Sequence, residues 1–167
     1  MTVTEVNKDA DALTLAITAE FDASVEQVWQ LWSDPRKLER WWGPPTYPAT
    51  MVEHALTPGA KVAYFMTGPD GDRHHGWWQV VAVDAPTRLE FDDGFADEAG
   101  VPNPDLPVGR VRVQLDQRDG GGTRMTVTTA FASAAAMDQV LAMGMEEGMV
   151  LAMGQMDGIL SEAGAST

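Results

Sequence analysis

The sequence predicts an α+β domain in which a curved antiparallel sheet wraps one long C-terminal helix. Two observations lead to this class. Residues 49–131 form short alternating segments separated by turns rich in proline and glycine, a pattern typical of an antiparallel meander. Residues 133–162 instead carry apolar side chains at helical spacing, which predicts an amphipathic helix that covers the sheet. A length of 167 residues suits one such domain.

The segment in front of the meander predicts one strand and two short helices. Residues 12–21 alternate between apolar and polar side chains, which indicates a strand. Ser24 and Gln27 form a capping box in front of apolar side chains at helical spacing. Pro35 suits the first turn of a second short helix, which we expect to end near Trp42. With the meander, these elements predict a sheet of about six to seven strands.

The two ends of the chain differ from the segments between them. Residues 1–11 are mostly polar and are expected to form a flexible N-terminus, and residues 163–167 a flexible C-terminus. Residues 12–162 then make up the single domain. The first residues lack the basic start and apolar run of a signal peptide, so we expect a cytoplasmic protein.

Charge and composition argue against several classes of partner. The chain has 11 basic and 25 acidic side chains, a net charge of −14, which repels nucleic acids and anionic lipids. The sequence contains no run of about 18 apolar residues, so we expect no transmembrane helix. The chain has no cysteine, which excludes a thiol nucleophile and a cysteine-ligated zinc. We expect no nucleic-acid partner, no membrane partner, no cofactor and no bound metal.

The three histidines are the first candidates for proton transfer. His54 is expected on the inner face of a strand with Val52 and Leu56, where it would bind a polar ligand group or act as a base. The competing interpretation is a hydrogen-bonded core histidine. His74 and His75 are adjacent, so their side chains point to opposite faces of a strand and are a poor metal pair. Without a paired catalytic motif, we assign no catalytic residue.

Five short motifs occur in order on the expected elements: Trp41–Pro44, Leu56–Gly59, Asp84–Leu89, Gly122–Thr128 and Gly144–Met149. Together they resemble the family named for homologues of the activator of the ninety-kilodalton heat-shock chaperone ATPase. This family belongs to the START-like (SRPBCC) superfamily, and the resemblance covers residues 12–162. It implies the helix-grip fold, in which the curved sheet wraps the C-terminal helix and two short helices follow the first strand.

A cavity between the sheet and the long helix is expected to bind a small hydrophobic or amphipathic molecule. The acidic loop over residues 93–109 is expected to flank one entrance. For each side chain of the expected lining, the competing interpretation is plain core packing. The expected lining consists of Trp41, Trp42, Val52, His54, Tyr64, Met66, Trp78, Leu89, Phe91, Val113, Met145, Met149 and Met153.

Two other functions stay open at this stage. One is an enzyme of the cyclase or hydrolase type that uses His54 or Tyr64 as acid or base. The other is an interaction protein that assists a chaperone, which the family name suggests. The sequence contains no feature that selects either of them.

A homodimer is a further expectation. Four apolar residues of the long helix fall outside the stripe that is expected to face the sheet, namely Val140, Met143, Val150 and Leu151. A patch of this kind on the outer face of a helix is typical of an interface, and two-fold pairing is the commonest way to bury it.

Overall fold

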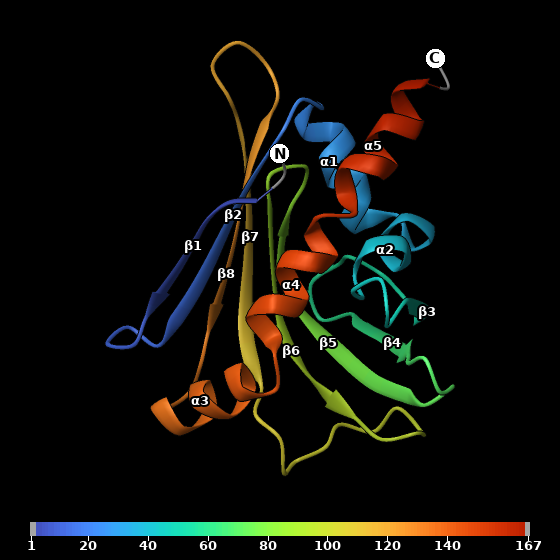
Figure 1. The fold of residues 1–167 in the computed structure, drawn as a ribbon, viewed down its shortest axis with the longest axis vertical. Coiled ribbons are helices and arrows are strands. Elements are labelled where there is room, and N and C mark those ends of the chain that lie inside the picture. Colours follow the sequence, from blue (N-terminus) through green and yellow to red (C-terminus); the bar gives the residue numbers. More distant parts are fainter. Residues whose placement is uncertain (1–2, 166–167) are drawn as a thin grey trace.

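A computed structural model describes residues 3–165, and Figure 1 shows its arrangement of one sheet and several helices. The antiparallel sheet has eight strands in the order β1-β2-β8-β7-β6-β5-β4-β3. Its strands are β1 (Val3–Asp9), β2 (Thr14–Phe21), β3 (Ala49–Glu53), β4 (Lys61–Thr67), β5 (Arg73–Asp84), β6 (Arg88–Ala96), β7 (Gly109–Gln117) and β8 (Thr123–Ala130). The described helices are α1 (Val25–Ser33), α2 (Pro35–Trp41), α3 (Ala134–Ala142), α4 (Met145–Met153) and α5 (Met156–Ala165).

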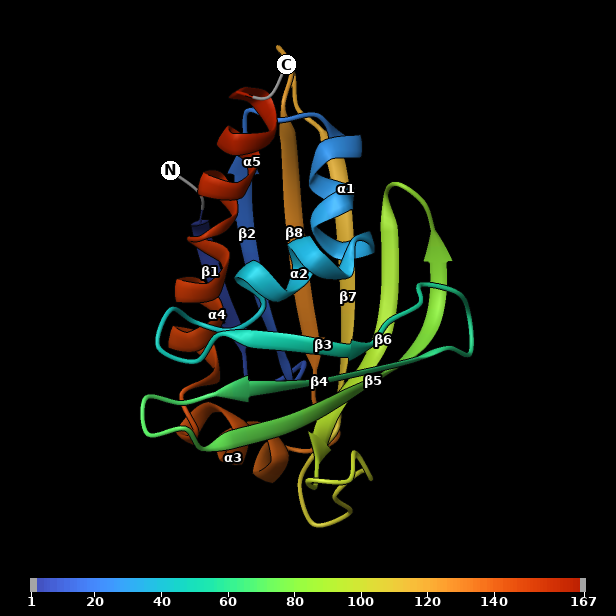
Figure 2. The ribbon, with the colours of Figure 1, turned by 90° about the vertical axis from the view of Figure 1, so that its right-hand side faces the viewer.

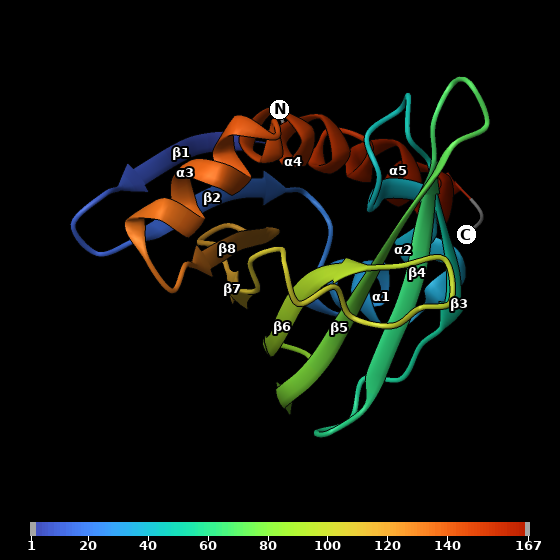
Figure 3. The same cartoon turned by 90° about the horizontal axis from the view of Figure 1, so that it is seen from below.

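The sheet curls into an open arc with helices across its opening. Figure 3 shows β1 and β2 at one end of the arc, β3 and β4 at the other, and α4 and α5 along the open side. Figure 2 shows β3, β4 and β5 crossing the long strands β7 and β8 steeply, with α1 and α2 in front of β7 and β8. The predicted helix-grip class is confirmed. No helix within residues 3–165 is long and apolar enough to cross a membrane.

The two short helices begin where their capping residues predict. The Ser24 side chain accepts a hydrogen bond from the backbone N–H of Gln27 at 3.2 Å, and Gln27 Oε1 accepts one from the Ser24 N–H at 3.0 Å. This reciprocal pair satisfies backbone donors that a helix start leaves without partners. Pro35 occupies the first turn of α2, and the Asp34 side chain caps that helix through the N–H of Arg36.

The N-terminal segment contains a strand that the sequence did not predict. Residues 3–9 pair with β2 as β1, which adds an edge strand to the sheet and raises its strand number above our expectation. Most side chains of β1 are exposed, so the segment carries no buried, alternating apolar face that could have revealed it. Backbone hydrogen bonds hold this strand in place. The expectations for residues 1–2 and 166–167 lie outside the described residues.

The C-terminal segment is three helices, so the prediction of one continuous helix over residues 133–162 is wrong. The first break follows Met143, where Gly144 adopts a left-handed conformation with φ of +87°. A helical wheel assumes right-handed geometry throughout and does not detect this change. The second break lies at Gly154 and Gln155, before α5. Residues 163–165 belong to α5.

The break at Gly144 also divides the four residues of the expected dimer patch. Val140 lies in α3 and Met143 directly follows it, while Val150 and Leu151 lie in α4. Val150 packs against the core, and Leu151 is 57% exposed. The four residues therefore do not share one face of one helix. The homodimer stays a prediction.

The two glycines Gly144 and Gly158 allow a direct test of the helix break. A Cβ atom would meet no neighbouring atom at either position, so the two glycines differ only in backbone conformation. We expect Gly144→Ala to lower the free energy of unfolding by about 1–2 kcal/mol, because alanine is strained in the left-handed region. Gly158→Ala, inside α5, should raise it by about 0.5–1 kcal/mol. Urea denaturation of both variants measures the two free energies of unfolding. Equal changes of the same sign would contradict a left-handed conformation of Gly144.

Candidate functional site

A pocket of about 260 Å³ opens at the end of the fold where α3 lies (Figure 1). It is bounded by the ends of strands β4 to β8, the junction of α3 and α4, and the loop after β6. This volume lies just below the range of about 300–1,000 Å³ that is typical of sites for small molecules. Its lining consists of Trp42, Pro44, Tyr64, Met66, His74, His75, Gly76, Asp93, Gly94, Phe95, Pro107, Gly109, Thr129, Phe131, Val140, Met143, Gly144, Met145, Gly148 and Met149.

The expected lining residues divide into those at the pocket and those in the core. Five of them contribute to the pocket, namely Trp42, Tyr64, Met66, Met145 and Met149. Six others are fully buried away from it, namely Trp41, Trp78, Leu89, Phe91, Val113 and Met153. The buried six fill the inner part of the grip. These six residues therefore belong to the packed core, which was the competing interpretation.

Val52 and His54 lie outside the pocket, contrary to our expectation. In β3 the inward positions are Ala49 and Met51, and Val52 points outward with 67% of its surface exposed. A register shift between Met51 and Glu53 ends the regular alternation. His54 follows the end of β3, and its Nε2 lies 3.0 Å from the carbonyl oxygen of Trp32.

The environment of His54 is that of a structural histidine. Its hydrogen bond connects the segment after β3 to the end of α1. Burial lowers the pKa of His54, while the bond to the Trp32 carbonyl opposes that decrease. His54 therefore cannot act as an acid or a base in the pocket.

The polar centre of the pocket is the pair Tyr64 and Asp93. The Tyr64 hydroxyl donates a hydrogen bond to Asp93 Oδ1 at 3.3 Å. Tyr64 lies on β4 and Asp93 on β6, so the phenol ring reaches across β5 between them. Gly76 makes this possible, because a Cβ atom there would stand only 2.4 Å from Cζ and the hydroxyl oxygen of Tyr64.

The pocket environment shifts the pKa values of both partners upward. Burial raises the pKa of Asp93 to about 7, and the hydrogen bond from Tyr64 partly opposes this rise. Burial and the charge of Asp93 raise the pKa of Tyr64 well above its usual value, so Tyr64 stays a neutral donor. The indole N–H groups of Trp42 and Trp78 favour the ionised phenol and partly offset that second rise. Near neutral pH, Asp93 is thus divided between its two protonation states.

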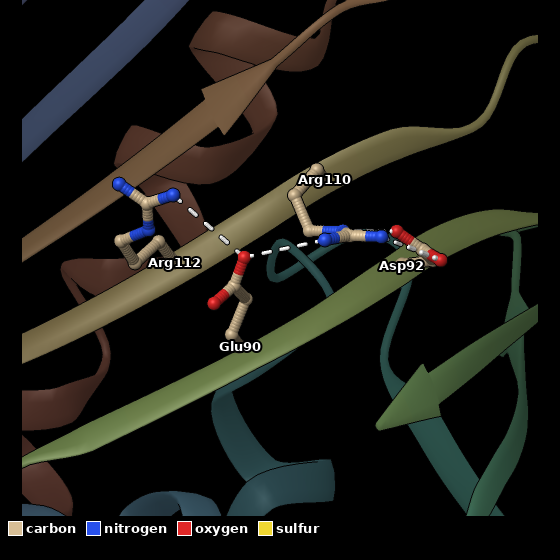
Figure 4. A network of polar contacts seen from close by, with 4 residues as sticks. All are labelled: Glu90, Asp92, Arg110 and Arg112. Atoms are coloured by element: carbon tan, nitrogen blue, oxygen red, sulfur yellow. Dashed lines mark hydrogen bonds and ion pairs between the residues drawn. The ribbon is translucent and has the colours of Figure 1, made fainter. Parts of the chain in front are cut away.

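The neighbouring carboxylate, Asp92, points to the opposite face of the sheet. Figure 4 shows it paired with Arg110, whose Nη2 lies 3.3 Å from Asp92 Oδ2. Arg110 also contacts Glu90 at 3.3 Å, and Arg112 lies 3.7 Å from the same Glu90 oxygen. These cross-strand ion pairs neutralise the outward carboxylates of β6. Asp93 remains the carboxylate that faces the pocket.

The comparison with known proteins gives the family of this chain. The family model described as "Activator of Hsp90 ATPase homolog 1-like protein" (AHSA1) matches residues 22–161. The chain belongs to this family. The resemblance that the motifs indicated is therefore confirmed. No curated protein matches the chain.

Solved structures of other family members and relatives show the same fold. Protein Ms6760 from Mycobacterium smegmatis is 52% identical, with a TM-score of 0.88, over 95% of this chain and 96% of that one. A protein from Arthrobacter aurescens is 53% identical, with a TM-score of 0.92, over 96% and 93% of the two chains. The AHSA1 protein of Silicibacter pomeroyi is 21% identical, with a TM-score of 0.72 over 90% and 99%, which shows the fold alone.

Asp93 is a site residue of this AHSA1 domain that our sequence analysis missed. We placed residues 93–109 in a loop because they are acidic and rich in glycine and proline. The structure continues β6 to Ala96, so the loop begins at residue 97. The signal was present, because the alternation of Leu89 and Phe91 extends to Asp93 and Phe95. The shortened loop does flank the pocket, through Pro107.

A second hollow, of about 640 Å³, lies among β2, α1 and α5. Its lining is largely polar and includes Glu20, Arg118 and Asp157, and Arg118 pairs with Glu20 at 2.7 Å. Sites for small organic molecules are mostly apolar with a few polar groups, which describes the smaller pocket better. Among the described residues no cluster of three or more histidine, aspartate or glutamate side chains could hold a metal ion.

The close approach of Tyr64 to Gly76 predicts a strong coupling between the two positions. Gly76→Ala should lower the free energy of unfolding by about 1–3 kcal/mol, because the new methyl group displaces the phenol ring. In a Tyr64→Ala background the same change should cost little. Urea denaturation of the wild type, both single variants and the double variant measures the coupling. Additive effects would show that Tyr64 does not cross β5 at Gly76.

The raised pKa of Asp93 predicts a specific pH dependence of stability. Its folded pKa, about 7, lies above the ordinary value of 3.8, so its contribution to stability is complete at low pH and decreases as pH rises through both values. Relative to wild type, we expect Asp93→Asn to become progressively more stable as the pH rises from about 4 to about 8. Urea denaturation across this range measures the difference. A difference that does not change with pH would contradict a raised pKa.

Proposed function

We propose that this AHSA1-family chain binds a small hydrophobic or amphipathic molecule in the pocket beside α4. The observation that carries the proposal is the composition of the pocket, an apolar lining with the Tyr64–Asp93 pair at one place in it. Pockets of this kind hold the body of a ligand through apolar contacts and orient it through a few polar groups. Membership in a family with a ligand-binding fold supports the same conclusion.

The methionines suit such a role. Met66 on β4 and Met145 and Met149 on α4 are partly exposed and line the pocket from two sides. Methionine side chains are unbranched and polarisable, so they adapt their shape to different apolar ligands. Phe95 and Phe131 add flat apolar surface. On the helix side Gly148 leaves open space, because nothing stands within 4 Å of the place that its Cβ atom would take.

An enzyme of the cyclase or hydrolase type is the second candidate, and the Tyr64–Asp93 pair favours it. A carboxylate with a pKa of about 7 can accept or donate a proton at neutral pH, and the Tyr64 hydroxyl is a neutral donor 3.3 Å away. His54 does not take part, because it lies outside the pocket. Turnover of thioester or polyketide substrates that is lost in Tyr64→Phe and Asp93→Asn would support an enzyme. Binding without turnover would support a binding protein.

The primary experiment identifies a natural ligand. We expect native mass spectrometry of the protein purified from its own host to show a small molecule bound to the 18.1 kDa chain. A second measurement uses the neutral fluorescent probe N-phenylnaphthylamine. Gly148→Met should weaken probe binding by about tenfold or more, because the new side chain occupies the pocket.

Gly158→Met is the matched control for this experiment. It lies in α5, its Cβ atom also meets open space, and it does not line the pocket. Both variants should gain up to about 1 kcal/mol of stability, because methionine is a better helix former than glycine. The probe should bind Gly158→Met as it binds the wild type. Equal binding to Gly148→Met and Gly158→Met would contradict the proposal.

A further inference from the structure

The charges of the pocket favour one class of ligand. Among its described lining residues there is no lysine and no arginine. The titratable side chains of the lining are Asp93 on β6, Tyr64 on β4, and His74 and His75 on β5. Asp93 is the carboxylate of this set, and the whole chain carries a net charge of −14. A ligand with a negative charge would therefore meet repulsion and no lysine or arginine side chain as a partner.

Asp93 itself has an unused acceptor. Its Oδ1 accepts the hydrogen bond from Tyr64, and the described residues make no hydrogen bond to its Oδ2. No ion pair to Asp93 is formed within residues 3–165, whereas Asp92 next to it is paired with Arg110 on the outer face. A carboxylate in a mostly apolar pocket without a cationic partner is costly, and a ligand that brings a positive charge removes that cost.

Aromatic rings complete the surroundings that a cation prefers. Trp42, Tyr64, Phe95 and Phe131 all line the same pocket. The face of an aromatic ring attracts cations, most strongly for tryptophan. A carboxylate together with several aromatic rings and no basic side chain is the chemistry that recognises an ammonium group.

We propose that the pocket takes a hydrophobic amine, whose ammonium group bonds to Asp93 Oδ2 while its apolar body packs against the aromatic and methionine side chains. This inference rests on the proposed function of the pocket and specifies its ligand class. A fatty acid of the same size is disfavoured by repulsion from Asp93. An alcohol of the same size makes one neutral hydrogen bond and gains no charge attraction.

The preference for amines depends on pH in a defined direction. An ammonium group binds the ionised form of Asp93, so affinity should rise with pH through about 7. His74 and His75 are the other side chains of the lining that could influence the binding of a cation. A variant with both histidines changed to glutamine separates these causes. It should keep the rise in affinity, and the further change Asp93→Asn in that same variant should abolish it.

The test compares three isosteric ligands by isothermal titration calorimetry near neutral pH, namely phenylbutylamine, phenylbutanol and phenylbutanoate. We expect the amine to bind about tenfold more tightly than the alcohol, because its hydrogen bond to Asp93 is charge-assisted. The carboxylate should bind more weakly than either. In Asp93→Asn the ratio of amine to alcohol affinity should fall to about one. Asp92→Asn removes the same charge from the outer face and should leave the ratio unchanged.

The outcomes separate the two proposals. If the alcohol binds as tightly as the amine, or if Asp93→Asn leaves the ratio unchanged, the inference of an amine ligand is wrong while the binding function stands. If N-phenylnaphthylamine binds and none of the three ligands does, the inference is again wrong. If neither the probe nor any of the three ligands binds, both proposals are wrong.

Discussion

The packing of aromatic rings inside the grip determines where this protein has room for a ligand. Trp78 on β5 stacks on Phe91 of β6 with ring centroids 3.9 Å apart, and Trp42 packs edge-on against Trp78 at 4.9 Å. Trp32 from α1 and Trp41 from α2 join this cluster, with ring centroids 4.7 Å apart. Rings of this size fill the space between the short helices and the sheet. They leave the end of the grip near α3 unfilled, where the pocket lies.

The same cluster has a polar edge beside the Tyr64 hydroxyl. The indole N–H groups of Trp42 and Trp78 are buried and form no hydrogen bond within the described part of the chain. Both groups influence the Tyr64 hydroxyl, which itself donates to Asp93. A buried donor without a partner costs about 1–3 kcal/mol, which the burial of the large rings offsets. The site therefore stands at the boundary between a filled aromatic core and an open apolar pocket, and this explains why a carboxylate there is both buried and reachable.

Some of the site was predictable because it follows from local periodicity. The sequence analysis included Tyr64 and Met66 in the expected lining, and the helical spacing along α4 placed Met145 and Met149 toward the sheet. The expectation for Val52 and His54 was wrong because the inward face of β3 is that of Ala49 and Met51, so Val52 points outward, and His54 lies beyond the end of the strand. Asp93 was missed for the opposite reason. Its strand continues further than its acidic, glycine-containing sequence suggests, because pairing with β5 holds it in place.

The sequence by itself determined the α+β class, the family, the capped starts of α1 and α2 and most of the strands, because each depends on residues that are close in the chain. Only the tertiary structure decided the rest. β1 exists because β2 offers a free edge, and Tyr64 meets Asp93, 29 residues away, because β5 lies between them with glycine at position 76. Contacts of this kind depend on register between distant strands, and no periodicity within a single segment records that register.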